Sequence, residues 1–270
     1  MRRLPGQLLR LGVGHDSLAL VRTSSMFGAR REVVAEAQFD GAHEPQALAR
    51  SLQALLAGAR VAGWPVTVVL ADELVRMWQV APPPLAASPA DLEAAAAMRF
   101  AHLFGAAPGG WTIAADWQAT RPFLAAALRN DMLATLAQAA VEARCTLVEV
   151  VPQFVAALNG WRKLRRPGAW FGQVHGQVLS IAAYDGPLLA ALRTAVVPPG
   201  ADREWLESHV AREALRVGIG RPERLQVCGS APRNWVSHEG RLKFSCTLLD
   251  GEEEAGMSPA VRLACTGSAA

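Results

Sequence analysis

The sequence predicts an α/β protein made of small sheets with helices packed against them. Short apolar runs typical of strands alternate along the chain with longer segments that carry helical periodicity and cap residues. Of the 270 residues, 51% are hydrophobic and 19% are charged, so the chain can bury a large core. Connectors rich in proline, glycine or arginine divide it into three pieces, which we expect at residues 1–81, 82–160 and 161–270.

The first piece begins with a predicted β-hairpin. Apolar runs at residues 8–13 and 17–23 flank a polar tip that contains His15 and Asp16, a pattern typical of two paired strands. The elements that follow are a strand at 32–39, a helix from Pro45 with an apolar stripe of leucines, and a strand at 66–70 after a turn at 63–65. This piece therefore reads as three strands, a helix and a fourth strand.

Three successive prolines, Pro82–Pro84, mark the first boundary, because proline cannot donate ladder hydrogen bonds and favours extended connectors. Ser88 then supplies an N-cap, and Pro89 a first-turn proline, for a helix that we expect to reach residue 102. The rest of this piece alternates between strands, expected at 111–117, 123–128 and 146–151, and helices, expected at 130–144 and 152–161.

A segment with four cations, Trp161–Gly168, marks the second boundary. Short basic runs are common at boundaries, which favours a solvated connector over a dedicated anionic site. The elements expected after it are strands at 169–174, 177–184 and 225–228 and a helix at 202–217. We expect the C-terminal stretches at 250–254 and 267–270 to be loosely held.

The composition argues against several classes of function. The net charge of +3, from 27 basic and 24 acidic residues, is too near balance to indicate a nucleic-acid binder. Four widely spaced cysteines without a histidine at ligand spacing predict neither a disulfide framework nor a metal site. No serine or cysteine has the surrounding motif of a hydrolase nucleophile, so we assign no catalytic residue.

The chain has no segment typical of export or of a membrane span. Its N-terminal apolar stretch is interrupted by Pro5, Gln7 and Arg10, which makes it a poor signal peptide. The longest uncharged stretch, at 167–184, contains Pro, three Gly and two Gln, and therefore predicts strands instead of a transmembrane helix. We expect a cytoplasmic protein.

Two hairpin-like segments suggest an internal duplication. The segment Gly12–Leu18 can be laid over Gly172–Val178, which matches Gly12 with Gly172 and His15 with His175. Each segment reads as a strand, a tight turn and a strand, and each begins one half of the chain. The positions of the two segments support a duplication more than the two identities do.

A duplicated chain of this kind, with a proline-bounded segment inserted after its first half, resembles the actin-like ATPase fold, a two-lobed, ribonuclease H-like α/β fold of the ASKHA class. More narrowly, it is similar to the PilM protein of type IV pilus assembly and to the cytoplasmic domain of the GspL protein of type II secretion, both bacterial. The supporting stretches, in chain order, are Leu11–Ser17, Arg76–Pro82, Phe123–Leu128, Leu147–Pro152, Ala156–Leu158 and Val227–Ala231. None is specific alone, and their order carries the resemblance.

The resemblance implies a nucleotide site, and the sequence departs from it. In actin-like ATPases, glycine hairpins place backbone N–H groups against the phosphates, and an aspartate in each hairpin strand holds magnesium-bound water. The corresponding residues here are Gly12 and Gly172, and the lysine or polar residue expected after the first turn is Ala19. The paired glycines near the adenine are reduced to Gly229 and Ser230. We therefore expect no ATP hydrolysis and no required cofactor, although a degenerate ATP site is possible.

The residues that such a degenerate site would use are Gly14, His15, Asp16, Ser17, Gly229 and Ser230. The main reading of His15 and Asp16 is that they satisfy turn geometry by bonding nearby backbone. The alternative function is a divergent actin-like ATPase or small-molecule kinase in which Asp16 has become the metal carboxylate.

Eight tryptophans stand against a single tyrosine. Most should be core residues, because indoles bury large areas, but Trp78 and Trp117 could line a groove for a partner peptide. The resemblance implies the partner: PilM-type proteins dock the cytoplasmic tail of a PilN-like inner-membrane protein, and GspL-type proteins contact the secretion ATPase. We expect a non-enzymatic scaffold that binds no nucleic acid and reaches the inner membrane through its partner.

Overall fold

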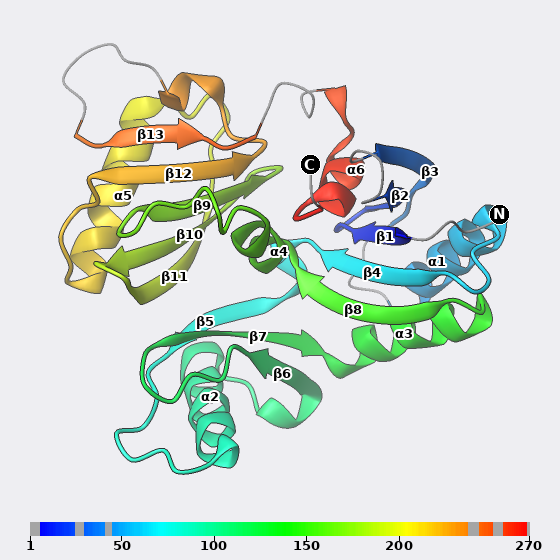
Figure 1. Ribbon diagram of the computed structural model, residues 1–270, viewed down its shortest axis with the longest axis horizontal. Helices are drawn as coiled ribbons and strands as arrows, with labels where there is room; N and C mark the ends of the chain where they lie inside the picture. The colour runs from blue at the N-terminus through cyan, green and yellow to red at the C-terminus, as the bar shows by residue number, and fades with distance from the viewer. Residues whose placement is uncertain (1–5, 25–29, 41–44, 237–242, 251–255, 269–270) are drawn as a thin grey trace. The chain divides into compact units, whose positions relative to one another are not determined.

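The computed structural model describes residues 6–24, 30–40, 45–236, 243–250 and 256–268 (Figure 1). The chain divides into two compact units. Unit 1 comprises Met1–Val75, Leu128–Arg162 and Glu253–Ala270, and unit 2 comprises Arg76–Ala127 and Lys163–Glu252. Both units mix strands and helices, so the predicted α/β class is confirmed.

Unit 1 contains a five-stranded sheet in the order β3-β2-β1-β4-β8. Its strands are β1 (Gln7–Val13), β2 (Ser17–Ser24), β3 (Arg30–Gln38), β4 (Pro65–Leu70) and β8 (Thr146–Pro152). The pairs β1–β2 and β2–β3 are antiparallel, whereas β1–β4 and β4–β8 are parallel. The predicted hairpin is therefore present, and the remaining strands extend its sheet on both sides.

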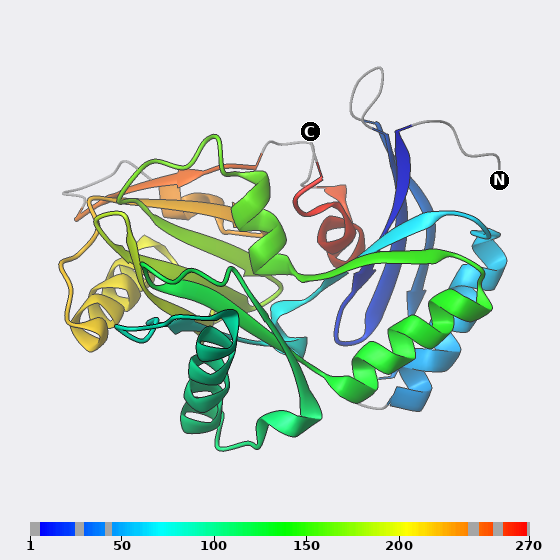
Figure 2. The same cartoon turned by 60° about the horizontal axis from the view of Figure 1, so that its bottom comes forward.

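Helices cover both faces of this sheet (Figure 2). They are α1 (Pro45–Ala59), α3 (Asn130–Glu142), α4 (Gln153–Gly160) and α6 (Pro259–Cys265). α1 packs beside α3 on one face, and α6 packs on β1 and β2 from the other. α6 begins with Pro259, and its N-cap is Ser258. The Ser258 hydroxyl accepts a hydrogen bond from the Val261 N–H at 3.2 Å.

Unit 2 contains a small sheet in the order β5-β7-β6, with one long helix on it. The elements are β5 (Arg76–Val80), α2 (Pro89–Phe104), β6 (Trp111–Ala115) and β7 (Phe123–Arg129). α2 starts with a capping box between Ser88 and Asp91 and ends at Gly105, whose φ of 63° suits glycine. The helix buries Leu92, Ala96 and Phe100 against the sheet.

The second sheet of unit 2 has five strands in the order β11-β10-β9-β12-β13. They are β9 (Trp170–His175), β10 (Val178–Asp185), β11 (Leu188–Val196), β12 (Arg224–Gly229) and β13 (Ser245–Leu248). α5 (Arg203–Val217) packs on this sheet through Leu206, Val210 and Ala214. The described residues of the whole chain also include three short 3-10 helices: η1 (Asp72–Leu74), η2 (Pro108–Gly110) and η3 (Arg233–Val236).

The two five-stranded sheets have the same topology. In each, three strands form an antiparallel meander and two further strands run parallel to the first strand of that meander. Gly12 of β1 and Gly172 of β9 lie on equivalent first strands, as the matched hairpin segments predicted. The duplication therefore lies in sheet topology more than in residue identity.

The boundaries of the units differ from the three expected pieces. β5 lies before Pro82–Pro84, yet it pairs with β7, so unit 2 begins at Arg76 and not at residue 82. β8 was expected in the inserted piece, but it pairs with β4 and belongs to unit 1. Proline positions mark connectors, whereas strand pairing decides which unit a strand joins.

Two strands and one α-helix were not predicted: β11, β13 and α6. The C-terminal stretch was expected to be loose, and this is wrong for residues 267 and 268. A Cβ added at Gly267 would lie 2.4 Å from the Ala156 carbonyl oxygen, and the Ser268 N–H and hydroxyl donate to the Cys265 carbonyl at 3.0 and 2.6 Å. Asp250 also has a partner, described below, whereas 251–255 and 269–270 lie outside the described residues. In the part of the chain that the structure describes, no helix has the length and apolarity to cross a bilayer.

Candidate functional site

The tip of the first hairpin is held by backbone hydrogen bonds. The Gly14 N–H donates to the Ser17 carbonyl at 2.8 Å, and the Phe39 N–H donates to the Asp16 carbonyl at 2.8 Å. The side chains of His15 and Asp16 are exposed, and that of Ser17 is half-buried. Gly14, His15, Asp16 and Ser17 therefore form one turn of unit 1, in which backbone groups that could face a phosphate are partly used by the turn.

Below this turn, Gly12 and Ala19 are direct cross-strand partners. Ala19 is fully buried and packs in one cluster with Ala260, Val261 and Ala264 of α6. A Cβ added at Gly12 would lie 2.7 Å from both the Ala260 carbonyl oxygen and the Ala264 amide nitrogen. The positions where the resemblance expects an aspartate and a lysine are thus covered by a helix of the same unit, and position 12 has no room for any side chain.

The second hairpin has a tighter turn, with no aspartate in the turn or at the matched position 172. β9 and β10 are joined by Gly176 and Gln177, and the φ of Gly176 is 56°. Gly172 pairs with Ile181, and a Cβ added at Gly172 would lie 3.4 Å from the Leu179 side chain and 3.5 Å from that of Val227. A methyl group would fit here, but a carboxylate would enter a buried apolar cluster, where its charge would be unpaired.

The loop after β12 is occupied by bonds within unit 2. The Gly229 N–H donates to the Asp250 carboxylate, and the Ser230 N–H and hydroxyl donate to the Val174 carbonyl at 2.9 and 3.3 Å. Gly229 has a φ of 86°, and an added Cβ would lie 2.0 Å from the Val174 carbonyl oxygen. Glycine is therefore required here by close packing onto β9, and the donor groups of Gly229 and Ser230 already have acceptors inside the chain.

These residues do not fit magnesium–ATP. Neither hairpin strand carries a carboxylate at the matched position, the position after the first turn is a buried alanine, and a carboxylate already accepts from the Gly229 N–H. Gly14–Ser17 lie in unit 1, and Gly229 and Ser230 lie in unit 2. The assignment of these residues to nucleotide binding remains a prediction from the resemblance.

Two buried polar residues at the N-terminus of α4 were not singled out from the sequence. Asp72, two residues after the end of β4, accepts a hydrogen bond from the Phe154 N–H at 2.9 Å. Gln153, fully buried, donates to the Thr266 hydroxyl at 3.1 Å. An acidic residue two positions after a buried apolar strand was the available signal for Asp72. Both residues join α4 to other parts of unit 1, and we assign them a structural role.

Trp78 does not line a groove. Its side chain is 2% exposed and packs against Phe100 and Phe104 of α2, with ring centroids 5.3 and 5.9 Å apart. Of the two alternatives that the sequence left open, Trp78 is therefore a core residue. Trp117 is half-buried, with its ring centroid 6.0 Å from that of Phe123, and its φ is 40°, a value that bulky residues rarely adopt. The assignment of Trp117 to partner binding stays a prediction.

Cys145, Cys246 and His209 are not activated groups. Burial raises the pKa of Cys246 to about 11 and also raises the pKa of Cys145, so both thiols are neutral at physiological pH. Burial lowers the pKa of His209, which stacks on Trp205 at a centroid distance of 5.2 Å. No group of three or more His, Cys, Asp or Glu side chains in the described residues could hold a metal ion.

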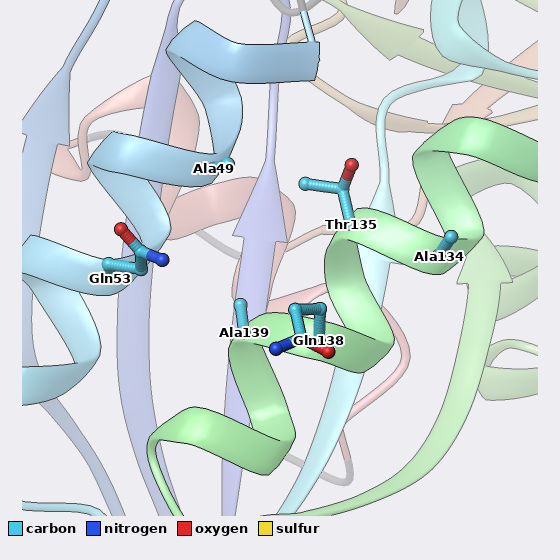
Figure 3. A pocket seen from close by; sticks show the side chains of 6 residues that line it. All are labelled: Ala49, Gln53, Ala134, Thr135, Gln138 and Ala139. Atoms are coloured by element: carbon cyan, nitrogen blue, oxygen red, sulfur yellow. The ribbon is translucent and has the colours of Figure 1, made fainter.

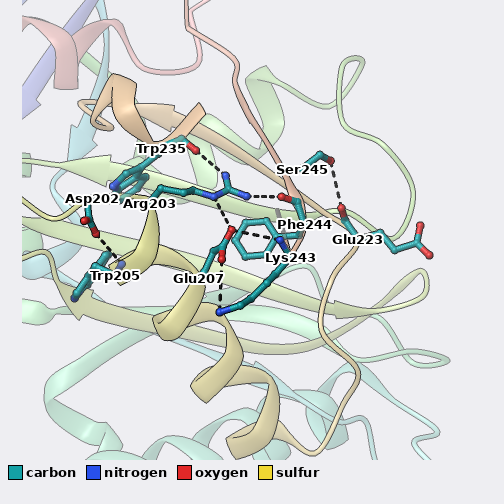
Figure 4. Close-up of polar contacts among 9 residues, drawn as sticks. All are labelled: Asp202, Arg203, Trp205, Glu207, Glu223, Trp235, Lys243, Phe244 and Ser245. Atoms are coloured by element: carbon teal, nitrogen blue, oxygen red, sulfur yellow. Dashed lines mark hydrogen bonds and ion pairs between the residues drawn. The ribbon is translucent and has the colours of Figure 1, made fainter. Parts of the chain in front are cut away.

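The densest polar network belongs to α5 and is structural (Figure 4). The Arg203 guanidinium pairs with Glu207 at 3.0 Å, donates to the Trp235 carbonyl at 2.6 Å and donates to the Phe244 carbonyl. Lys243 lies 3.7 Å from Glu207. Each charge has a partner within the network, which joins η3 and the start of β13 to α5 and leaves no group directed at a ligand.

A shallow hollow of about 270 Å³ lies between α1 and α3 (Figure 3). It is lined by Ala49, Gln53, Ala134, Thr135, Gln138 and Ala139. The Gln53 and Gln138 amides donate to the Glu142 carboxylate at 2.6 and 2.8 Å. Small apolar side chains and already bonded amides offer no acid, base or nucleophile, so we assign no chemistry to this hollow.

Comparison with known proteins shows the fold. No family model and no curated protein sequence matches the chain. The cytoplasmic domain of EpsL, an inner-membrane component of the type II secretion system of Vibrio cholerae, has a TM-score of 0.60 at 12% identity and covers 97% of this chain and 94% of its own. A PilM–PilN type IV pilus biogenesis complex has a TM-score of 0.61 at 18% identity, with 96% of each chain covered.

A third structure, a Bacteroides thetaiotaomicron protein of unknown function with an actin-like ATPase fold, has a TM-score of 0.57 at 11% identity over 84% of each chain. The chain therefore has the actin-like ATPase fold, as the resemblance predicted. The likeness to PilM and EpsL covers nearly the whole chain, and at these identities it concerns the fold alone.

Proposed function

We propose that this protein is a non-enzymatic, actin-like scaffold of a type IV pilus or type II secretion platform at the bacterial inner membrane, and that it binds the cytoplasmic tail of a membrane partner. The observation that carries the proposal is the packing of α6 on Gly12 and Ala19. The fold is retained over almost the whole chain, while α6 covers the sheet face that would carry the aspartate and lysine of an ATPase. Conservation of architecture without phosphate-binding groups is what a binding scaffold needs.

The partner surface that we propose is the β6 edge with Trp117. β6 is an outer strand of the β5-β7-β6 sheet, so its outward backbone groups can pair with an added extended peptide. Trp117 follows this strand closely, and its unusual φ holds a half-buried indole beside the edge. Tryptophan is enriched at the centres of interfaces because one rigid side chain buries a large area. A PilN-like cytoplasmic tail is the expected ligand, and a secretion ATPase is the alternative partner.

Calorimetric titration with a synthetic peptide tests this proposal, using the cytoplasmic tail of the PilN-like protein from the same organism. We expect wild-type protein to bind, and Trp117→Glu to weaken binding by at least about tenfold, because a charge replaces the interface aromatic. The control is Leu215→Ser, which removes an apolar side chain that is 77% exposed on α5. Equal binding by wild type and Trp117→Glu would remove this surface from the proposal, and binding by neither would remove the partner class.

The non-enzymatic part has its own test. Thermal unfolding with and without magnesium–ATP should give the same midpoint, because Gly229 and Ser230 already have internal partners. A magnesium-dependent increase that is lost in Asp16→Ala would instead support the alternative, a divergent ATPase or kinase with Asp16 as its metal carboxylate.

A further inference from the structure

The basic segment Lys163–Arg166 of unit 2 is an ordered part of the fold and not a free connector. Gln226 of β12 is 5% exposed, and its side chain binds the segment twice. Its amide N–H donates to the Leu164 carbonyl at 3.0 Å, and its amide oxygen accepts from the Arg166 N–H at 2.7 Å. The Ala169 N–H also donates to the Arg166 carbonyl at 3.1 Å. The backbone of the segment is therefore fixed against the sheet.

This fixed backbone separates the side chains. Arg165 turns inward: its guanidinium lies over the rings of Phe171 and Tyr184, at 5.6 and 5.2 Å from their centroids, and donates to the Tyr184 hydroxyl at 2.8 Å. Lys163 and Arg166 are exposed, and Leu164 between them is 57% exposed. The segment thus presents an apolar side chain flanked by two cations.

The cations of the segment have no acidic partner among the residues that the structure describes. Lys163, Arg165 and Arg166 take part in no ion pair in those ranges. Lys163 and Arg166 therefore give the exposed surface of the segment a positive charge.

We propose that Lys163, Leu164 and Arg166 form a contact site for anionic phospholipids. Cations near such a surface bind headgroup phosphates, and an exposed leucine between them can enter the boundary between headgroups and acyl chains. Nucleic acid is a poorer fit, because binders usually place six or more cations on phosphates or stack aromatic side chains on bases. The site goes beyond the proposed function, in which the membrane is reached only through a partner protein, and it does not depend on it.

The expected affinity is modest. Each basic residue close to an anionic bilayer raises partitioning roughly fivefold. Where another contact holds the molecule near the surface, such a site forms at high effective concentration and orients the protein.

Vesicle flotation of the full chain tests the site. We expect binding to vesicles of equal phosphatidylglycerol and phosphatidylcholine, no binding to phosphatidylcholine alone, and weaker binding as salt is added. Lys163→Glu/Arg166→Glu should lower partitioning by at least about 25-fold, the product of two fivefold contributions. Leu164→Ser should lower it by several-fold without changing the salt dependence.

The matched control is Arg99→Glu/Arg121→Glu, which changes the net charge equally at two exposed positions of unit 2. It should keep most of the vesicle binding, and all variants should keep the wild-type melting temperature. Equal loss in this control would show attraction by net charge and overturn the site, as would absence of binding by wild type. Competition by a polyglutamate peptide or a DNA duplex as effective as that by the vesicles would assign the segment to a general polyanion and also overturn it.

Discussion

The two five-stranded sheets share one topology, but the faces that carry Gly12 and Gly172 are covered in different ways. In unit 1, Arg10 of β1 donates to the carbonyls of Ala264, at 2.7 Å, and of Thr266, so a strand at the start of the chain holds a helix from its end. In unit 2, the matched residue of β9 is Trp170, whose indole N–H donates to the Tyr184 carbonyl of the adjacent hairpin at 3.1 Å. In unit 1 the backbone of a helix remote in sequence lies against this face, whereas in unit 2 apolar side chains of the sheet and of α5 cover it.

The two matched glycines show what this difference means for substitution. Gly12 meets backbone atoms, which cannot move without displacing α6, whereas Gly172 meets the ends of apolar side chains, which can adjust. Equivalent positions of a duplicated fold therefore have different tolerance. In unit 1, packing against α6 excludes an aspartate at position 12. In unit 2, the apolar surroundings of position 172 disfavour an aspartate, because its charge would be unpaired.

The largest expected effect is that of Gly12→Ala. A methyl group 2.7 Å from two backbone atoms should separate α6 from β1 and lower the free energy of unfolding by about 3 kcal/mol or more. The comparison variant Gly172→Ala should change the free energy of unfolding by less than about 1 kcal/mol. Its added methyl group makes ordinary contacts, and the substitution removes a glycine from a strand interior, where glycine is unfavourable. Urea denaturation of both variants measures the difference, and equal effects would mean that the two faces are not distinct.

Arg10→Met should have the next largest effect. Burial lowers the pKa of the Arg10 guanidinium, but its hydrogen bonds hold the C-terminal end of α6, and their loss should cost about 2 kcal/mol. Arg22→Met, which breaks only a partly exposed pair with Glu32 on the same sheet, should cost less than about 1 kcal/mol. Limited proteolysis near residue 256 should increase in the Arg10 variant alone.

A smaller effect is expected at the loop after β12. Asp250→Ala leaves the Gly229 N–H without its carboxylate acceptor and should lower the free energy of unfolding by about 1 kcal/mol, whereas Asp250→Asn keeps an acceptor oxygen and should lose less. Neither variant should gain stabilisation by magnesium–ATP, because positions 12 and 172 still lack a carboxylate. Gain of such stabilisation in Asp250→Ala would show that this carboxylate alone blocks a nucleotide site.

The smallest effect concerns pH and α5. Because the folded-state pKa of His209 is below its ordinary value of 6.5, the unfolded chain binds this proton first as pH falls. Stability should therefore decrease by less than about 1 kcal/mol between about pH 6.5 and pH 5. His209→Gln should reduce that slope, and identical slopes in the variant and the wild type would contradict the assignment.

Local signals in the sequence predicted most of the individual elements. The N-cap Ser88 and the first-turn Pro89 mark a real helix start, and the first hairpin occurs where two apolar runs around a polar tip placed it. The prediction missed β13 and α6, which have four and seven residues and are stabilised by packing on other elements, β13 on β12 and α6 on β1 and β2 from the opposite end of the chain. It also missed β11, a nine-residue strand that pairs with β10.

The sequence by itself determined the α/β class, the duplicated hairpins and the absence of hairpin aspartates, because these follow from residue type and short-range periodicity. Only the tertiary structure decided that Trp78 is core, that β5 belongs with β7, and that α6 covers Gly12. The physical reason is separation along the chain: Arg10 and Ala264 are 254 residues apart. A contact over such a distance has no local sequence signature.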